Sequence, residues 1–345
     1  MAHRPHRLLL SGRALRANWR ALNDAAKVET GAAIKADGYG LGAREVMERL
    51  YDEGAREFFV ATWGEAEALG DLPEGARLAI FHGLGPYDID DARRSVARPV
   101  LNSVEQVRRW RGSGIDGACD VMVDTGMNRL GLAMDELGAL DGLRIDILHS
   151  HLACADEPDN PLTPLQRERF QTAKAKVAAN RYSLANSAGI ALGRDYAFDL
   201  VRPGLALYGG VPRPDMAAMV APVARLQAQV VQRRTIAAGD TIGYNATYTA
   251  PADMPVAILN IGYADGYPRN MTGKGVASFD GIALPLVGRV SMDLVAVDLR
   301  EAPQVKEGDW LDLASDPQTL AAAAGISQYE ALTGMGQRFE RKWVD

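Results

Sequence analysis

The feature that most constrains the fold is an alternation of short β-rich runs with amphipathic helical stretches, from about residue 13 to residue 210. Helical patterns include residues 13–27 and 43–51, and residues 163–166 (Thr-Pro-Leu-Gln) form a capping-box pattern with proline at the first helical position. The strand-like runs are residues 31–35, 57–62, 77–81, 97–101, 119–124, 143–150, 181–186 and 198–208. Eight strand–helix units in about 200 residues predict a (β/α)8 barrel. A doubly wound open sheet is the alternative, because periodicity fixes the strand count poorly.

The pattern changes near residue 222. Further strand-like runs follow with few helical stretches between them, at residues 224–235, 255–261, 275–279 and 287–299, and a short alanine-rich helix is predicted at residues 317–324. We therefore expect an α/β chain with a (β/α)8 barrel over residues 1–221 and a mostly-β C-terminal domain over residues 222–345. The N-terminal residues are candidates for pairing with the second domain.

Composition excludes several classes of protein. The net charge of −6 gives no basic face for nucleic acid, and no apolar run approaches the ~18 residues of a membrane span. The apolar run Leu8-Leu-Leu10 is too short for a secretory signal. The two cysteines, Cys119 and Cys154, suggest neither a disulfide framework nor a metal site, which favours a reducing cytoplasm.

A lysine closes the first apolar run, in Gly31-Ala-Ala-Ile-Lys35. Burial lowers the pKa of a lysine, and such a lysine is a nucleophile toward aldehydes such as pyridoxal phosphate (PLP). On this segment alone, a solvated lysine at a strand end is equally expected. Other polar residues follow later runs, at the ends where barrels place their active sites: Asp124, Arg129, His149, His151, Asn186, Ser187 and Arg202. Their gathering favours a functional Lys35.

Several segments, in one order along the chain, carry a resemblance to a known family. They are Ala32-Ala-Ile-Lys-Ala-Asp-Gly-Tyr-Gly40, Val123-Asp-Thr-Gly-Met-Asn-Arg-Leu-Gly131, His151-Leu-Ala-Cys-Ala-Asp-Glu157, Ala185-Asn-Ser-Ala188, Val201-Arg-Pro-Gly-Leu-Ala-Leu-Tyr-Gly209, Gly243-Tyr-Asn-Ala-Thr-Tyr248, Ile261-Gly-Tyr-Ala-Asp-Gly-Tyr267 and Gly288-Arg-Val-Ser-Met-Asp293. With these segments the chain resembles the alanine racemases, PLP enzymes built from a barrel and a β domain.

The resemblance implies roles for individual residues. Lys35 is similar to the lysine that holds PLP, and Tyr244 to a second catalytic base that the other subunit of a dimer contributes. Arg129 and Met292 match positions that receive the substrate carboxylate, and Tyr263 matches a tyrosine at the entrance. The implied cofactor-binding positions are Lys35, Tyr39, His151, Asn186, Ser187, Arg202, Gly204 and Leu205, with no metal. Of these, His151 would lie beside the pyridine ring and Arg202 would meet its nitrogen.

Two departures from the family pattern concern the site. Many members have a carbamate-modified lysine seven residues before the arginine, where this chain has Met122, so Arg129 must be oriented by a neighbouring side chain or a bound anion such as chloride. Many also have a tyrosine that touches the phosphate near the C-terminus, where this chain has Gln337.

The resemblance implies a cytoplasmic homodimer with shared active sites that interconverts L- and D-alanine and supplies D-alanine for peptidoglycan. A racemase of broader specificity on the same scaffold and a PLP-binding protein without turnover are the alternatives. A PLP decarboxylase is disfavoured, because it needs an acidic partner for the pyridine nitrogen where this chain has Arg202. Taken singly, Tyr244 could be a packed strand residue and Ser187 a helix N-cap; the joint pattern favours the site.

Overall fold

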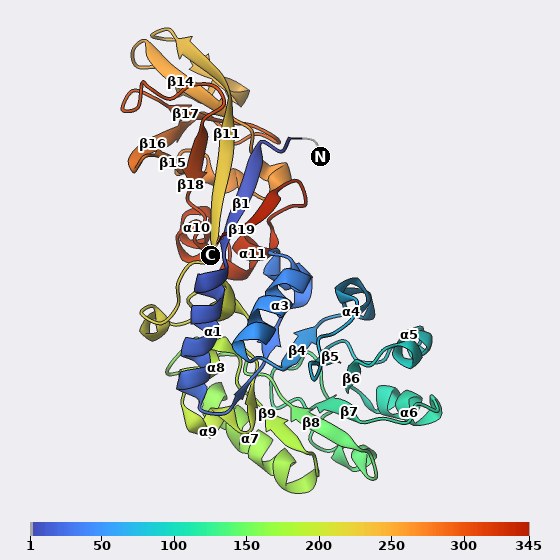
Figure 1. Cartoon of the computed structure of the whole chain (residues 1–345). Coiled ribbons are helices and arrows are strands. Elements are labelled where there is room, and N and C mark those ends of the chain that lie inside the picture. Colours follow the sequence, from blue (N-terminus) through green and yellow to red (C-terminus); the bar gives the residue numbers. More distant parts are fainter. Residues whose placement is uncertain (1–2, 345) are drawn as a thin grey trace. The chain divides into compact units, whose positions relative to one another are not determined.

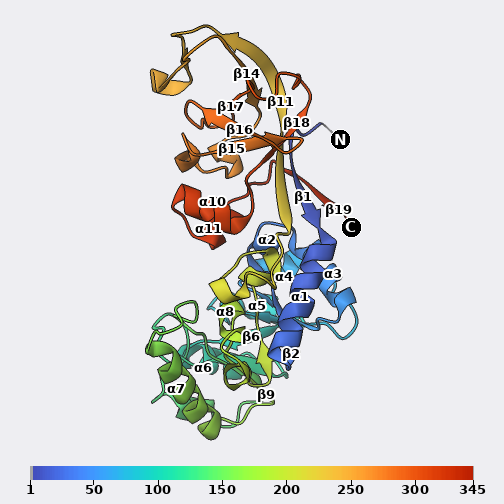
Figure 2. The same cartoon turned by 90° about the vertical axis from the view of Figure 1, so that its left-hand side faces the viewer.

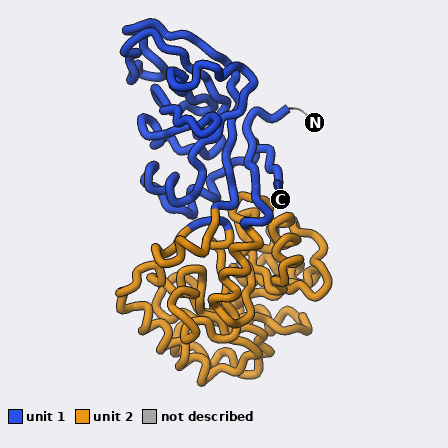
Figure 3. Tube along the Cα trace, turned by 60° about the vertical axis from the view of Figure 1, so that its left-hand side comes forward, with its two compact units in different colours: residues 1–14, 208–210, 222–345 blue, residues 15–207, 211–221 orange. Residues whose placement is uncertain are grey.

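The computed structural model describes residues 3–344 and divides into two compact units (Figure 3). The barrel unit consists of Leu15–Leu207 and Val211–Ala221. The β unit consists of the described residues up to Ala14, Tyr208–Gly210 and the described residues from Pro222 onward. No helix among residues 3–344 has the length and apolarity needed to cross a bilayer.

Seven parallel strands, in sequence order from β3 to β9, form the main sheet of the barrel unit. They are β3 (Ala32–Ala33), β4 (Glu57–Val60), β5 (Arg77–Ile80), β6 (Arg98–Leu101), β7 (Cys119–Met122), β8 (Ile145–His149) and β9 (Arg181–Ser183). The eighth barrel strand, β10 (Leu200–Val201), pairs with β2 (Glu29–Thr30). The amide of Arg202 donates to the Ala185 carbonyl at 2.9 Å and the amide of Gly31 to the Val201 carbonyl at 3.0 Å. Hydrogen bonds on both sides of β10 therefore join the last strands to the first, and the predicted barrel is confirmed.

Helices connect these strands, and in Figure 1 α4, α5 and α6 lie outside β5, β6 and β7. The helices are α1 (Gly12–Ala26), α3 (Ala43–Glu53), α4 (Trp63–Leu69), α5 (Ile89–Arg94), α6 (Val104–Gly112), α7 (Leu162–Lys176), α8 (Ser187–Ile190) and α9 (Arg194–Ala197), with 3-10 turns η1 (Leu137–Leu140), η2 (Leu205–Tyr208) and η3 (Pro214–Met216). Side-chain caps begin α4 and α6, where Thr62 and Ser103 accept hydrogen bonds from backbone amides three residues later. An apolar cluster from six strands fills the middle of the barrel: Phe59, Ala79, Val100, Met122, Ile147 and Leu200.

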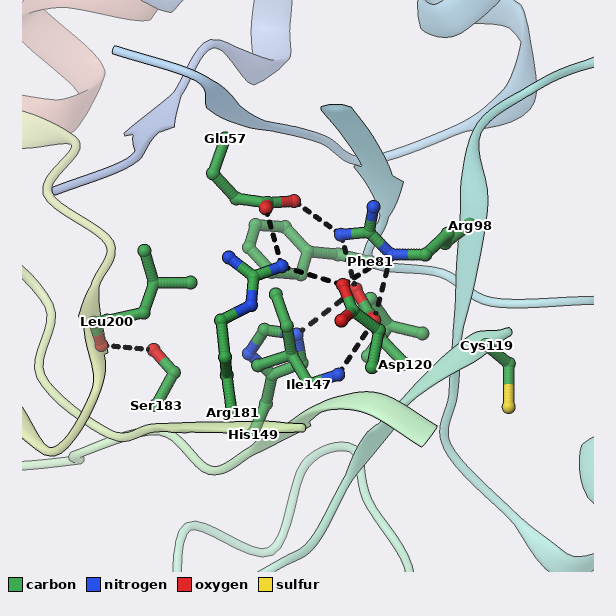
Figure 4. A network of polar contacts seen from close by, with 12 residues as sticks. Glu57, Phe81, Arg98, Cys119, Asp120, Ile147, His149, Arg181, Ser183 and Leu200 are labelled. Atoms are coloured by element: carbon green, nitrogen blue, oxygen red, sulfur yellow. Dashed lines mark hydrogen bonds and ion pairs between the residues drawn. The ribbon is translucent and has the colours of Figure 1, made fainter. Parts of the chain in front are cut away.

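Charged side chains fill the end of the barrel where the strands begin (Figure 4). Glu57 is fully buried and pairs with Arg77 at 2.7 Å, with Arg181 at 2.8 Å and with Arg98. Arg98 also meets the buried Asp120 at 3.0 Å. We call these residues the base network. It closes one end of the barrel and leaves the opposite end, where the strands finish, for chemistry.

The structure corrects two of the local patterns predicted in the barrel. The run at 198–208 is a strand only over Leu200–Val201, since Pro203 has no amide to donate, and Leu205–Tyr208 forms a 3-10 turn instead. The capping box at 163–166 is absent, because α7 begins at Leu162 and places Thr163 inside the helix. The Thr163 hydroxyl donates to the Cys154 carbonyl, and the Gln166 side chain binds the amide of Ala153 and the carbonyl of His151.

An eight-stranded sheet with the order β14-β17-β16-β15-β18-β11-β1-β19 makes up most of the β unit, and β11 also pairs with β14. The strands are β1 (His6–Ser11), β11 (Ala224–Ile236), β14 (Met254–Leu259), β15 (Val276–Phe279), β16 (Ile282–Val287), β17 (Val295–Asp298), β18 (Trp310–Leu313) and β19 (Glu340–Val344). Strand β1 runs antiparallel to β11 and parallel to β19, so the first and last strands lie side by side (Figures 1 and 2).

Smaller elements complete the β unit. They are the hairpin β12 (Thr241–Ile242) and β13 (Tyr248–Thr249), the 3-10 turns η4 (Tyr244–Ala246), η5 (Tyr263–Asp265) and η6 (Arg269–Met271), and the helices α10 (Pro317–Ala324) and α11 (Gln328–Thr333). The helix predicted at 317–324 is confirmed. The single strand predicted at 287–299 is wrong, because the chain leaves the sheet at Gly288, whose φ is 71°, and re-enters at Val295.

Candidate active site

Lys35 begins a left-handed turn that is separated from β3 by Ile34 alone. The turn is α2 (Lys35–Tyr39), and Ala36, Asp37 and Tyr39 have φ values of 53°, 52° and 55°. Each such residue costs about 1–2 kcal/mol relative to a right-handed conformation, because its Cβ crowds the following carbonyl oxygen. Backbone strain of this kind persists only where surrounding contacts enforce it, and it concentrates at functional sites.

Glu65 ties the turn to the segment after β4. Its Oε1 accepts a hydrogen bond from the amide of Ala36 at 2.8 Å, and its Oε2 accepts one from the amide of Ala61 at 2.6 Å. The sequence prediction missed Glu65. A signal was present, because Thr62 and Glu65 have the spacing of a capping box, and the Thr62 hydroxyl accepts from the Glu65 amide at 3.2 Å.

A cavity of about 230 Å³ opens where the barrel strands end, and three of the predicted site residues line it: Lys35, Arg129 and His151. Burial and then the positive charge of Arg129 lower the pKa of Lys35, against the opposing effect of Glu65. Burial and the nearby cations lower the pKa of His151 to about 3, so this imidazole is neutral at pH 7. The cavity therefore combines an amine with an increased neutral fraction and an uncharged ring.

The loop that carries Arg129 is folded by Asp124. The Oδ1 of Asp124 accepts hydrogen bonds from the amides of Gly126 at 2.8 Å and Met127 at 2.9 Å. Met122, at the end of β7, packs in the apolar middle of the barrel and is 7% exposed. The departure at residue 122 thus contributes to the apolar core, while a carboxylate two residues later orders the backbone before Arg129.

Arg202 is a buried cation with an unused donor. Its guanidinium donates to the Ser183 hydroxyl and, at 2.6 Å, to the Ser150 carbonyl. Its Nε is also buried and has no hydrogen-bond partner among the described residues. Burial lowers the pKa of Arg202 to about 9, although Asp120 opposes this shift, so the side chain stays charged at pH 7. A buried donor without a partner suits a ligand that brings an acceptor.

Tyr39, Ser187 and Gly204 come together in the barrel unit. The Ser187 hydroxyl accepts hydrogen bonds from the amides of Gly204 at 2.9 Å and Ala206 at 3.2 Å. A Cβ at Gly204 would lie 2.2 Å from the Tyr39 hydroxyl, so any other residue there would displace the Tyr39 side chain. Asn186, rather than Ser187, is the N-cap of α8, since its Oδ1 accepts from the Gly189 amide at 2.9 Å.

Three predicted site residues belong to the β unit and are exposed there. Tyr244 begins η4, is 70% exposed, and lines a cavity of about 500 Å³. Tyr263 begins η5, and the amide of the next residue, Ala264, donates to the Met292 carbonyl at 3.0 Å. The structure therefore brings Tyr263 and Met292 together within the β unit, whereas Lys35 and Tyr244 belong to different units.

Two positions complete the comparison with the predicted site. Leu205 begins η2 directly after Gly204 and is buried. Gln337 is exposed on the segment that leads into β19. The barrel unit thus holds all the predicted cofactor residues, from Lys35 to Leu205.

The residues of the barrel unit fit PLP on three counts. Lys35 has the lowered pKa that condensation with an aldehyde needs. The Nε of Arg202 is a buried donor that a pyridine nitrogen can satisfy. The hydroxyls of Tyr39 and Ser187 meet at Gly204, where the missing Cβ allows the backbone to approach a phosphate closely.

Comparisons with known proteins agree with this geometry. The family model of the alanine racemase N-terminal domain matches residues 10–212, and that of the C-terminal domain matches residues 223–343. The chain is 41% identical to an alanine racemase of Acidiphilium cryptum over 341 residues, which cover 95% of this chain and 96% of the relative. It is 40% identical to a catabolic alanine racemase of Agrobacterium fabrum, over 96% of this chain and 90% of the relative.

A solved structure matches the whole fold. The crystal structure of alanine racemase from Bartonella henselae with covalently bound pyridoxal phosphate has a TM-score of 0.91 at 33% identity and covers 99% of each chain. The family models, the full-length relatives and the shared fold thus lead to one conclusion: this chain belongs to the alanine racemase family of PLP-dependent isomerases.

Proposed function

We propose that this isomerase interconverts L- and D-alanine with two bases, Lys35 and Tyr244, that act on opposite faces of the substrate Cα. Racemisation requires a proton to leave one face of Cα and another to arrive on the opposite face, which two separate acid/base groups accomplish directly. The observation that carries the proposal is the placement of Lys35, with its lowered pKa, in the barrel cavity beside Arg129 and His151.

PLP, when bound, withdraws electron density from the Cα of the amino acid and makes its proton removable. Lys35 would hold the cofactor through Nζ, and the same Nζ, when free and neutral, takes up or returns the proton on one face. The phenol oxygen of Tyr244 does so on the other face. Arg129 and the backbone at Met292 bind the substrate carboxylate, and Tyr263 lines the entrance.

Arg202 favours racemisation over competing reactions. A guanidinium only donates hydrogen bonds, so an Arg202 Nε bonded to the pyridine nitrogen requires that nitrogen to be unprotonated. Through this hydrogen bond Arg202 would leave the cofactor a weaker electron sink, which would favour reprotonation of Cα over decarboxylation or transamination. The neutral His151 would lie beside the same ring without adding charge. The phosphate would be held by Tyr39, Ser187, Gly204 and Leu205.

We also propose that the enzyme is a cytoplasmic homodimer that supplies D-alanine for peptidoglycan. Its support is the exposure of Tyr244 and Met292, at 70% and 53%, because catalytic groups need a covered, dry site and a second copy of the chain would provide the cover. The two free cysteines suit a reducing compartment. Residues 1–221 and 222–345 remain the proposed domains, with β1 completing the second.

Chiral chromatography tests the function. L-alanine is incubated with PLP and the purified protein, the Lys35→Ala variant or the Tyr244→Phe variant. We expect the wild type to reach near-equal amounts of both enantiomers, Lys35→Ala to do nothing, and Tyr244→Phe to bind PLP but lose most activity. PLP binding without D-alanine would overturn alanine as the substrate, and serine and lysine would be tried next. An unchanged rate in Tyr244→Phe would overturn the two-base mechanism.

A further inference from the structure

Two loops of the β unit that the proposed function assigns to the substrate are joined by one arginine. We call residues 262–267, which carry Tyr263, the entrance loop, and residues 288–294, which carry Met292, the carboxylate loop. We propose that Arg338 is a positioning residue for substrate binding, because it bridges these two loops. The inference rests on the roles proposed above for Tyr263 and Met292, and it concerns only residues within the β unit.

The first arm of the bridge is Asp265, two residues after Tyr263. Asp265 is fully buried, and its Oδ2 accepts a hydrogen bond from the Gly262 amide at 2.9 Å. Its Oδ1 accepts from the Arg338 Nε at 2.6 Å and lies 3.2 Å from the His6 Nε2. Burial lowers the pKa of His6, although Asp265 opposes this shift, which leaves Arg338 as the permanent positive charge against this carboxylate.

The second arm is Asp293, which directly follows Met292. The Nη1 of Arg338 donates to the Asp293 Oδ1 at 2.8 Å. One planar guanidinium therefore contacts a carboxylate from each loop at the same time. A lysine at this position could not reproduce the arrangement, because its ammonium is a single point charge without the fixed fork of donors.

The loops also touch through their backbones, so the bridge acts on a contact that already exists. The amide of Tyr263 donates to the Ser291 carbonyl and that of Ala264 to the Met292 carbonyl, each at 3.0 Å. A Cβ at Gly262 would lie 2.3 Å from both carbonyl oxygens. Because the backbones of the two loops approach this closely, a shift of either loop displaces the other. Such a shift would also move the backbone that is proposed to receive the substrate carboxylate.

Exposure indicates that the Asp293 arm of the bridge contributes to alignment more than to folding. The Arg338 and Asp293 side chains are 46% and 50% exposed, and an ion pair of this kind adds little to stability. The other arm ends on the fully buried Asp265 carboxylate, so Arg338→Met also lowers stability, whereas Asp293→Ala breaks the exposed arm alone. A small misplacement of substrate-binding groups, in contrast, has a large effect on binding and rate. Loss of the bridge should therefore raise KM for alanine while the chemical groups themselves remain intact.

The test is a double-mutant cycle on the PLP-loaded enzyme, with Arg338→Met, Asp293→Ala and the double variant. We expect each single change to raise KM for L-alanine about fivefold with kcat within about twofold of the wild type. The KM of the double variant should be no higher than that of the more impaired single variant, since both changes break the same bridge. Arg338→Lys should recover only part of the loss. An unchanged KM in Arg338→Met, or effects that multiply in the double variant, would overturn the inference.

Arg300→Met is the matched control. Arg300 is 47% exposed in the same unit and pairs with Asp298 at 2.6 Å, away from both loops. Its loss removes an equivalent ion pair, so KM should not change. An equal rise in KM for Arg300→Met would attribute the effect to general destabilisation and overturn the inference.

Hydrogen exchange separates this inference from the proposed function. The amides of Tyr263 and Ala264 are protected by carbonyls of the carboxylate loop, so Arg338→Met should speed their exchange, whereas Arg300→Met should not. If the wild type makes no D-alanine, the proposed function fails and the exchange rates alone decide the inference. Equal exchange in Arg338→Met and the wild type would refute the bridge whatever the activity.

Discussion

The carboxylate of Glu65 accepts a hydrogen bond from the amide of Ala36 at 2.8 Å, and so holds the first left-handed residue after Lys35. Its other oxygen binds a second amide, so both oxygens act as acceptors. Glu65→Gln replaces one acceptor by an NH₂ donor that faces an amide. We expect kcat/KM for alanine to fall about tenfold, equivalent to about 1.4 kcal/mol, as measured by steady-state kinetics.

Glu67→Gln on the same helix is the control for Glu65→Gln, because Glu67 is exposed and its side chain takes no part in the turn. It should keep wild-type kinetics. Full activity in Glu65→Gln would mean that the turn holds its shape without this carboxylate.

The positive charge of Arg129 lowers the pKa of Lys35, in addition to the larger effect of burial. Arg129→Met removes this charge, so the pKa of Lys35 should rise and its neutral fraction at a given pH should fall. The measurement is the rate of PLP incorporation into cofactor-free enzyme as a function of pH, whose midpoint should move to higher pH. The exposed Arg108→Met should leave the midpoint in place, and a downward shift in Arg129→Met would contradict the expectation.

Gly204 lies against the Tyr39 side chain, with no room between them for a Cβ. Gly204→Ala places a Cβ 2.2 Å from the Tyr39 hydroxyl, and overpacking of this kind costs about 1–3 kcal/mol. We expect the Kd for PLP to rise about tenfold in a fluorescence titration. In a Tyr39→Phe background, Gly204→Ala should raise the Kd for PLP by a smaller factor, because the clashing oxygen is gone.

Gly138→Ala controls for the Gly204→Ala substitution, since a Cβ at Gly138 meets no atom within 4 Å. PLP affinity should not change there. If Gly204→Ala bound PLP as tightly as Gly138→Ala, the close approach at Tyr39 would have no bearing on the cofactor.

His149 makes the fold sensitive to acid. It is fully buried, and burial lowers its pKa to about 4 against the opposing hydrogen bond to Asp120. The unfolded chain binds a proton near pH 6.5, whereas the folded chain does so only near pH 4. The contribution of neutral His149 to the free energy of unfolding is therefore complete above pH 6.5. It falls as the pH drops from 6.5 to 4, by up to about 1.4 kcal/mol per pH unit.

Urea unfolding at pH 7, 5.5 and 4.5 measures this contribution. His149→Gln, which does not titrate, should show a free energy of unfolding that depends less steeply on pH than that of the wild type. Parallel pH profiles for the two proteins would show that His149 titrates alike in the folded and unfolded chains.

Glu57 is the buried centre of the base network (Figure 4). Glu57→Gln leaves Arg98 and Arg181 without their shared carboxylate, and breaking a buried ion pair typically costs about 3–5 kcal/mol. We expect the free energy of unfolding to fall by about this amount, with kcat unchanged at 25 °C, because the network lies at the end of the barrel away from Lys35.

The exposed pair of Glu105 and Arg108 gives the comparison for the base network. Glu105→Gln should change stability by less than about 0.5 kcal/mol. A loss of kcat in Glu57→Gln without a loss of stability would place the network in catalysis rather than in folding.

Much of the barrel could be predicted from the sequence, because buried parallel strands are apolar runs separated by amphipathic helices. Boundaries were harder. The first run ends in the sheet at Ala33, two residues before Lys35, since the chain then enters a left-handed turn that no periodicity reveals. Thr163 and Gln166 matched a capping box, but in the structure their side chains form hydrogen bonds with the backbone of the loop after β8 instead.

Some residues of the site could likewise be predicted from the sequence, and others could not. Lys35 and Arg202 could be found because polar residues at the ends of apolar strands conflict with burial unless they are used. Asp265 and Arg338 gave no such signal, since they are 73 residues apart and meet only in the folded β unit. Ser183, which accepts a hydrogen bond from Arg202, was equally invisible, because serine is common at strand ends.

The pairing of β1 sets the order in which the chain can fold as it is made. Arg7 lies opposite Gln227, 220 residues later, and β19 on the other side of β1 is the last strand. At about 5–20 residues per second, a ribosome needs roughly ten to forty seconds to deliver β11, and the whole barrel emerges in that interval. Until then β1 carries Leu8 and Leu10 without a sheet to bury them. The barrel is therefore free to fold during synthesis, whereas the β unit waits until β19 has been made.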